Sequence, residues 1–440
     1  MMYIQHYEKI KNIKYFSVYL FFAICCSFNF IPFISAEVQP VVGVFIIIVG
    51  FFSLDRTTPL DRLIIFIFLM FLSLMPSLVW GIYQNPSNVL TYFFYMIGPA
   101  IFYYFYKSFY FLKVKNLNFF VGLFSIITII QVISPESINS IINPIFELIV
   151  KRGKFGLDNE IRGVGILYSE PAHAARYIYL LMVFFISLKI SPQIFVDNKN
   201  NTTLTRKNVF FVLIGLFIMI VFNKSGTLFS LVLFNVIVYF ILISINLTPK
   251  KIGFFILLLP TFIVSVSLIY MLGDSLLTSR LSQLIDSYNN VKDNFSIDEL
   301  QYFGSIRFIS VLSGYAGGIL YPLGVGIGEG GNAIFEAMKW VGFDLNSISF
   351  LTTQDVDSLK PNSYFSQIVI ESGIIGWILV GTFSVFCFIN ISVKNNSLCF
   401  YSSVLLTAGF QLLFFSTTTI TSPWLSLALG LYGLKSLRYK

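Results

Sequence analysis

A short polar segment with the residue types of an acid–base site lies in a chain that is otherwise strongly apolar. Residues 161–177 read IRGVGILYSEPAHAARY and contain Arg162, Glu170, His173 and Arg176, and an apolar run of membrane-span length follows directly. A carboxylate can accept a proton from a hydroxyl group, and guanidinium groups bind phosphate through two parallel hydrogen bonds. The segment therefore predicts a site for an anionic ligand at a membrane surface.

Glu170 has two interpretations that the sequence leaves open. Pro171 is well suited to the first turn of a helix, and a carboxylate just before it is stabilised by the helix dipole; Glu170 would then only start the helix. In the functional interpretation, Arg162 and Arg176 hold Glu170 ionised so that it accepts a proton or positions a hydroxyl, with His173 assisting. His173 is otherwise an ordinary hydrogen-bonding residue.

Further candidate ligand-binding residues lie in two long polar segments, 134–171 and 273–365. Arg152, Arg280 and Arg307 are candidates for anion binding, although each could instead pair with a nearby acid on a solvated loop. Residues 307–337 are rich in glycine and apolar residues, which predicts a re-entrant or surface-lying segment whose N–H groups could cradle a phosphate. The span that follows begins near Asn362 and Glu371, two further candidates for substrate binding.

The composition sets the fold class. The 440 residues are 56% hydrophobic and only 11% charged, against roughly 25% charged in soluble domains. We therefore expect an all-α polytopic membrane protein, a single membrane domain over 1–440. About 20 apolar residues span a bilayer, and twelve such runs occur at about 15–34, 38–54, 63–82, 89–106, 117–133, 172–190, 208–223, 226–247, 252–272, 366–392, 398–415 and 421–436.

The distribution of Lys and Arg predicts the orientation of these spans. With both termini in the cytoplasm, 18 of the 29 basic residues fall in inside segments, as the positive-inside rule requires. Segments 134–171 and 273–365 then become two long external loops. The net charge of +8 is explained by this rule, so nucleic acid is not an expected partner. With two His and no Cys-x-x-Cys motif, no metal site is expected.

Several short motifs resemble the O-antigen polymerase (Wzy) family and, more distantly, the O-antigen ligases. These are the Arg/Glu-Pro entry to a middle span (RGVGILYSEPAHAARY), NKSGTLFSL at 223–231, PLGVGIGEG in a late loop, and ESGIIGW after an Asn-containing helix entry. An Arg-x10-Gly pattern occurs in both long loops, from Arg152 to Gly163 and from Arg307 to Gly318. Pro361 stands where the ligase-type motif has a histidine, which departs from the ligase pattern.

The resemblance implies an activity. The substrate would be an oligosaccharide on undecaprenyl pyrophosphate, joined to another at the periplasmic face of the bacterial inner membrane. Glu170, Arg162 and Arg307 would be catalytic. Arg152, Arg176, His173, Arg280, Asn362 and Glu371 would bind substrate. No cofactor is implied, and a chain-length regulator protein is a candidate partner beside the lipid bilayer. The alternatives are an O-antigen ligase and a lipid-linked oligosaccharide transporter.

Overall fold

The described part of the chain is helical. The computed structural model describes residues 15–32, 37–50, 62–134, 136–153, 163–195, 204–245, 306–343 and 360–438. Within these ranges, the only β-structure is an isolated bridge between Phe28 and Val150. The expected all-α fold is therefore confirmed for the described residues.

Seven helical segments in the described ranges are long and apolar enough to cross a membrane. They are Leu63–Gln84, formed by α4 (Arg62–Ser73) and α5 (Met75–Gln84); Asn88–Phe111, formed by α6 (Asn88–Ser108) and the 3-10 turn Phe109–Phe111; α7 (Val114–Ile133); α9 (Pro171–Ile190); α10 (Arg206–Asn223); α11 (Gly226–Ser244); and α19 (Asn396–Phe414). Each coincides with an expected span, because only a helix satisfies the backbone of an isolated apolar segment in lipid. The chain is an α-helical membrane protein.

The other five expected spans have a different form or lie outside the described residues. The described part of the first run is helical over Tyr15–Ile24, and the residues before Tyr15 lie outside the described ranges. The run at 38–54 is represented, in its described part, by α2 (Val41–Phe45) and the π-helix Ile46–Gly50. The run at 366–392 is divided into α17 (Tyr364–Ser372) and α18 (Ile374–Ile389), and the last run forms α20 (Ser422–Arg438). The run at 252–272 is outside the described ranges.

Gly373 causes the division between α17 and α18. Its φ of +59° is unfavourable for residues with a Cβ, and a Cβ there would lie 2.1 Å from the Pro322 carbonyl oxygen. Ile374 N–H donates to that same oxygen over 2.8 Å. The helix therefore breaks where the chain of the 321–330 loop crosses it.

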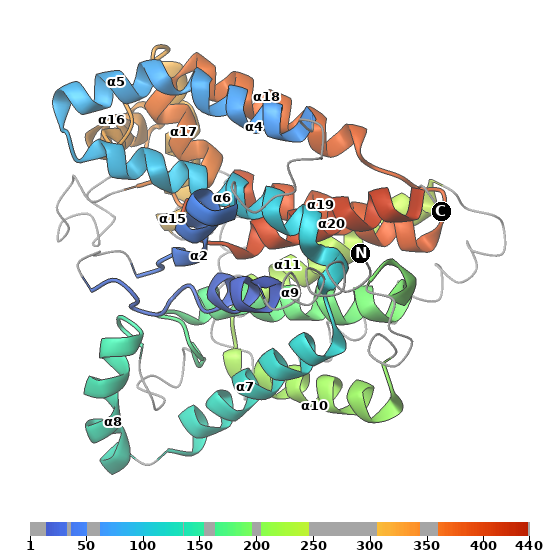
Figure 1. Cartoon of the computed structure of the whole chain (residues 1–440). Helices are drawn as coiled ribbons and strands as arrows, with labels where there is room; N and C mark the ends of the chain where they lie inside the picture. The colour runs from blue at the N-terminus through green and yellow to red at the C-terminus, as the bar shows by residue number, and fades with distance from the viewer. Residues whose placement is uncertain are drawn as a thin grey trace, which may run out of the picture.

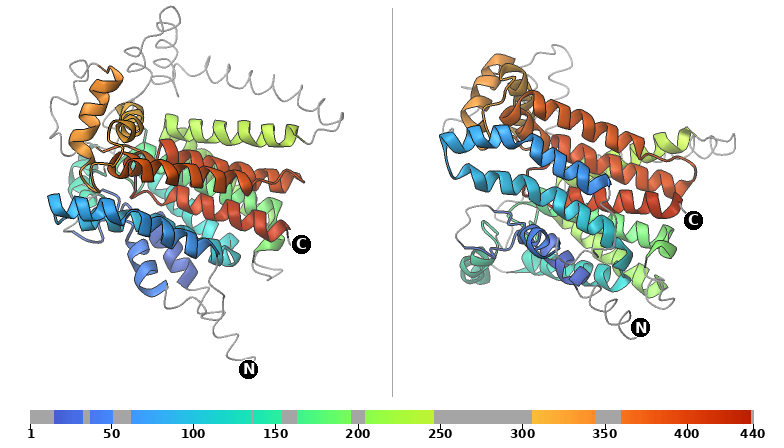
Figure 2. Two further views of the ribbon diagram at one scale, coloured as in Figure 1. Left: turned by 90° about the horizontal axis from the view of Figure 1, so that it is seen from above. Right: turned by 45° about the horizontal axis from the view of Figure 1, so that its top comes forward.

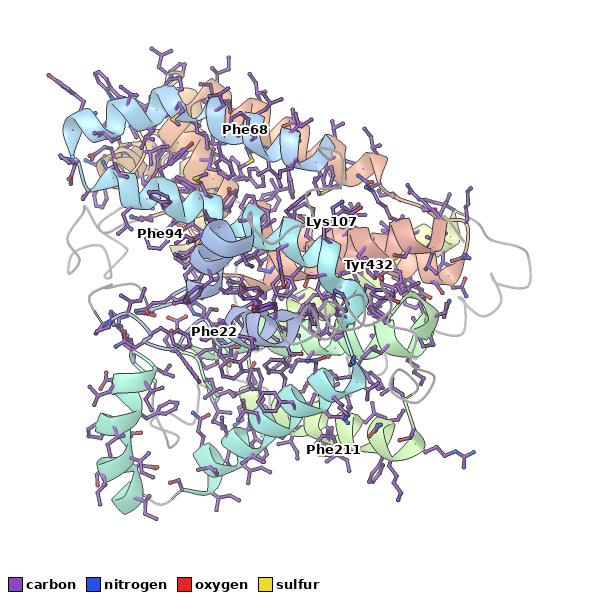
Figure 3. All side chains as sticks on the ribbon, viewed as in Figure 1. Phe22, Phe68, Phe94, Lys107, Phe211 and Tyr432 are labelled. Atoms are coloured by element: carbon purple, nitrogen blue, oxygen red, sulfur yellow. The ribbon has the colours of Figure 1, made fainter. Side chains whose placement is uncertain are left out.

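The central helices are α9, α19 and α20, which lie between an upper layer containing α4 and α18 and a lower layer containing α7 and α10 (Figure 1). The turned views keep α19 and α20 inside the bundle (Figure 2). Most of α9 and α19 is buried, whereas α10 and α11 are largely exposed. Phe68 on α4 and Phe211 on α10 are exposed at opposite edges (Figure 3). Such exposed apolar side chains are suited to lipid contact.

The remaining described helices gather at one end of the bundle. They are α8 (Glu136–Ile149), α15 (Ile306–Leu320) and α16 (Gly330–Val341), at the left in Figure 1. The 3-10 turn Pro192–Ile194, which follows α9, is not part of this group. We call this the Glu170 end, and the opposite end the Lys435 end. At the Lys435 end, Arg438 donates to the Asn390 and Ile391 carbonyls and the Lys435 ammonium lies 5.0 Å from the Tyr106 ring centroid.

The two ends differ in charge. All acidic residues in the described ranges lie at the Glu170 end: Glu37, Glu136, Glu147, Glu170, Glu329, Glu336 and Glu371. The Lys435 end has no acid among its described residues and carries nine basic residues: Lys107, Lys113, Lys115, Lys189, Arg206, Lys207, Lys394, Lys435 and Arg438. The Glu170 end carries seven basic residues beside its acids: Lys151, Arg152, Arg176, Lys224, Arg307, Lys339 and Lys360. The larger number of Lys and Arg residues at the Lys435 end is in the sense of the positive-inside rule, which counts basic residues only.

Candidate active site

Glu170 is the residue immediately before helix α9. Pro171 is the first helical residue, as expected, and Glu170 has an extended backbone with φ −137° and ψ 147°. The Glu170 carboxyl accepts no hydrogen bond from the first turn of α9. Its side chain therefore does not cap the helix through a hydrogen bond.

The Glu170 carboxyl is paired instead with Arg307 on α15, which is 137 positions away in the sequence. Each of the two side chains is 38% exposed, so the pair is accessible from the Glu170 end. Partial burial raises the pKa of Glu170, but the charge and the hydrogen bond of Arg307 outweigh this and leave the pKa below its usual value. Glu170 is therefore ionised at neutral pH. We expected Arg162 and Arg176 to hold this charge; Arg307 is the stronger neighbour.

Arg176 lies beneath this pair and is almost fully buried, with 5% of its surface exposed. Its Nη2 donates to the carbonyl of Phe415, the C-terminal cap of α19, where the helix dipole favours a cation. Its Nε and Nη1 have no hydrogen-bond partner within the described part of the protein. Buried donors are normally paired, so these two nitrogen atoms are buried donors that no described group of the protein satisfies.

His173 lies between Glu170 and Arg176 on the first turn of α9. Its backbone N–H donates to the Glu170 carbonyl over 3.0 Å, and its Nδ1 is buried without a hydrogen-bond partner among the described groups. Residues three apart on a helix are neighbours, so His173 and Arg176 face the same region. Both are electrostatic neighbours of Glu170. The four side chains thus form one cluster from α9 and α15.

The loop before α9 holds Glu170 in a fixed position. Ile166 has a φ of +59°, which is costly for a β-branched residue. The Gln131 amide at the end of α7 binds both backbone groups of Ile166, accepting from its N–H over 3.0 Å and donating to its carbonyl over 2.9 Å. Strained backbone that is held by its surroundings is common at functional sites. The loop is therefore anchored on α7 at Ile166, which is four residues before Glu170.

Two further contacts attach the loop to the bundle. The Asn223 amide at the end of α10 donates to the carbonyls of Val164 and Pro171 over 3.1 and 3.0 Å. The Tyr168 ring stacks on Tyr177 with 4.5 Å between ring centroids, and its hydroxyl donates to the Ile24 carbonyl over 2.6 Å. Three helices therefore determine where α9 begins.

Helix α15 positions Arg307 because it packs closely on α17. Cβ atoms on Gly314 and Gly318 would lie 2.2 Å from Ser366 Oγ and a Val369 methyl group, so only glycine allows this approach. Near the start of α15, the Ser310 hydroxyl donates to the Arg307 carbonyl over 2.8 Å and accepts from the Asn362 N–H over 3.3 Å. Ser310 thus connects Asn362 to Arg307 through two hydrogen bonds.

Arg152 and Glu371 do not join this cluster. Arg152 pairs with Glu37 at 2.7 Å and its side chain is 76% exposed. Glu371 is buried in α17, where its carboxylate accepts from the Tyr95 hydroxyl over 2.5 Å and from the Gln367 amide over 3.1 Å. Arg162 and Arg280 lie outside the described residues.

The glycine-rich loop between α15 and α16 uses its N–H groups internally. Val325 and Gly326 donate to the carbonyls of Ile370 and Glu371, and Ile327 donates to the carbonyl of Ser77. Gly328 N–H donates to the Glu371 carboxylate. These four N–H groups are therefore occupied by α5 and α17 and are not free to bind a phosphate.

Gln131, Asn223 and Ser310 support the site but were not among the sequence candidates. Gln131 and Asn223 are polar residues at the ends of two apolar runs, and both are buried. Burying an amide is costly unless it is hydrogen-bonded, so a lone amide at the end of a predicted span is the signal that could have identified them. Within the described ranges, no group of three or more His, Cys, Asp or Glu side chains could hold a metal ion.

Comparisons with known proteins add no relative: no protein-family model, no curated protein and no solved structure matches the chain.

Proposed function

We propose that the chain is a membrane glycosyltransferase that joins oligosaccharide repeat units carried on undecaprenyl pyrophosphate, as the sequence resemblance to O-antigen polymerases implies. The observation that carries the proposal is the cluster of Glu170, Arg307, His173 and Arg176 at one end of the bundle. It combines an ionised carboxylate with a buried arginine that has two nitrogen atoms without a partner among the described residues. A carboxylate and arginine donors are the groups that this reaction requires.

In this reaction, the bond between the anomeric carbon and the pyrophosphate oxygen breaks, and a glycosidic bond to the acceptor hydroxyl forms. Glu170 takes the proton of that hydroxyl. Arg176 and Arg307 stabilise the charge that develops on the departing pyrophosphate. The ion pair between Glu170 and Arg307 would open when the pyrophosphate binds Arg307, which leaves the carboxylate free for the acceptor. Arg162 is a further candidate for the pyrophosphate.

The charge asymmetry supports an orientation for this proposal. The Lys435 end, which is basic and without acids among its described residues, suits the cytoplasmic side, and the Glu170 end then faces the periplasm. Lipid-linked repeat units at the outer leaflet would present their pyrophosphate at the level of the Glu170 end. Both termini are then cytoplasmic, and the bacterial inner membrane is the proposed location.

The test is reconstitution of the purified protein in liposomes with undecaprenyl-pyrophosphate-linked repeat units and no lipid A core. A ladder of lengthened lipid-linked chains supports the polymerase. If the wild-type protein lengthens no chains, the proposal is contradicted. Transfer that requires added lipid A core indicates a ligase, and movement of unaltered lipid between leaflets indicates a transporter.

A further inference from the structure

Helix α8 (Glu136–Ile149) has three distinct faces. Its polar edge carries the exposed residues Glu136 and Glu147. Its buried edge carries Phe146, which packs into the core of the bundle. The third face is apolar and exposed: Ile138, Ile141, Ile145, Leu148 and Ile149 are each at least 45% exposed. At 100° per residue, this apolar face is opposite the polar edge, so α8 is strongly amphipathic.

The helix cannot cross a bilayer. Its 14 residues extend about 21 Å at 1.5 Å per residue, whereas the hydrocarbon core is about 30 Å thick. Figure 1 shows α8 across the end of the bundle, transverse to α9. Its C-terminal end is held there by Asn29, whose backbone N–H donates to the Ile149 carbonyl over 2.6 Å and whose side chain donates to the Leu148 carbonyl over 3.3 Å.

Helix α8 directly follows a membrane-spanning helix in the chain. Only residues 134 and 135 separate α8 from α7, whose last turns expose Ile126, Ile130 and Ile133. Exposed apolar side chains are therefore present on both sides of this two-residue connection. Exposed apolar surface of this kind indicates a membrane or protein contact, and its position two residues after the end of a spanning helix favours lipid.

We infer that α8 is an interfacial helix that lies in the plane of the membrane, with its apolar face about 5–10 Å into the boundary between headgroups and acyl chains. Glu136 and Glu147 face water. The inference rests on α8 and its position directly after α7, and it does not depend on the proposed catalytic activity. The occupant of the apolar face is the bilayer to which α7 belongs.

Fluorescence quenching by brominated lipids tests this placement. Ile141→Cys and Ile145→Cys in the full chain would be labelled with bimane and reconstituted in phosphatidylcholine liposomes with bromine either near the headgroup or near the acyl-chain end. Glu147→Cys is the matched control on the polar edge. The native cysteines Cys25, Cys26, Cys387 and Cys399 are buried, and labelled wild-type protein measures any background.

We expect labels at 141 and 145 to lose fluorescence with the bromine near the headgroup, to lose less with the deep bromine, and to resist iodide in water. The label at 147 should show the reverse. Quenching of 141 and 145 by iodide alone would overturn the inference. Protection from both quenchers together with disulfide-linked dimers of Ile141→Cys would overturn it too, in favour of a second copy of the chain. Elution of each variant as wild type on size exclusion verifies folding.

Discussion

Glu170 differs from an ordinary helix-start acid in what its carboxyl group contacts. A carboxylate that caps a helix accepts a hydrogen bond from the first turn, but Glu170 accepts from Arg307. Removing its charge should therefore leave the start of α9 intact. The ion pair itself is partly exposed, and such pairs contribute about 0–1 kcal/mol.

Glu170→Gln should accordingly abolish chain lengthening without unfolding the protein. General-base catalysis contributes about 10²–10⁴-fold, and the loss should fall in this range in the liposome assay. Glu136→Gln on α8 is the matched control and should keep wild-type activity. A wild-type ladder from Glu170→Gln at equal expression would refute the catalytic assignment.

Arg307 should determine the pH dependence of the same reaction. It lowers the pKa of Glu170 against the raising effect of burial, so the carboxylate stays ionised as the pH falls toward the ordinary glutamate value of about 4.3. In Arg307→Gln the lowering effect is lost and the pKa rises. The acid limb of the residual activity should therefore move to higher pH.

Arg307→Lys is the control for this shift, because a lysine keeps the positive charge. Its acid limb should stay near that of the wild type, while its rate falls because an ammonium cannot bind pyrophosphate in the bidentate manner of a guanidinium. An unchanged acid limb in Arg307→Gln would show that Glu170 is not the titrating base. The ion pair's contribution to stability follows the same sign: it is present above the ordinary pKa and lost as the pH falls through the lowered one.

At the scale of elements, the loop between α15 and α16 depends on glycine at a particular position. Gly328 has a φ of +90°, and a Cβ there would lie 2.1 Å from the Asn88 side-chain oxygen. Asn88 in turn donates to Glu329 over 2.6 Å and to the Gly81 carbonyl over 3.0 Å. A side chain at 328 would therefore disturb both the backbone and the contact between this loop and α6.

Gly328→Ala should lower the thermal unfolding temperature in detergent by several degrees. Gly381→Ala is the matched control: Gly381 lies inside α18 with nothing within 4 Å of its Cβ position. There alanine should be neutral or stabilise by up to about 1 kcal/mol. Equal unfolding temperatures for the two variants would contradict the account of this loop.

The sequence predicted the apolar helices better than the breaks within them. Pro171 correctly marks the start of α9, because proline acts through its own backbone. The break at Gly373 depends on the Pro322 carbonyl, and hydropathy averaged along the chain carries no information about a distant partner. The pairing of Glu170 with Arg307 was not predicted for the same reason, since it joins residues 137 positions apart.

At the scale of the whole molecule, the charge difference between the two ends predicts sidedness. Glu147 on α8 and Lys394 between α18 and α19 are both exposed and lie at opposite ends. In intact cells stripped of the outer membrane, Glu147→Cys should react with an impermeant maleimide. Lys394→Cys should react only after the membrane is permeabilised. The reverse pattern would invert the orientation and remove the periplasmic site.

The loop between α15 and α16 also determines how late in synthesis the packing around α5 and α6 can be completed. It joins α5 and α6 to α17 through pairs such as Gln84 with Val325 and Asn88 with Glu329, each 241 residues apart. At about 5–20 residues per second, the ribosome needs roughly 10–50 seconds to cover that distance. Throughout this interval α5 and α6 are already made while their partner is not. In the nascent protein, the surfaces of α5 and α6 that contact this loop must therefore stay without their partner in the membrane until the last third of the chain has been synthesised.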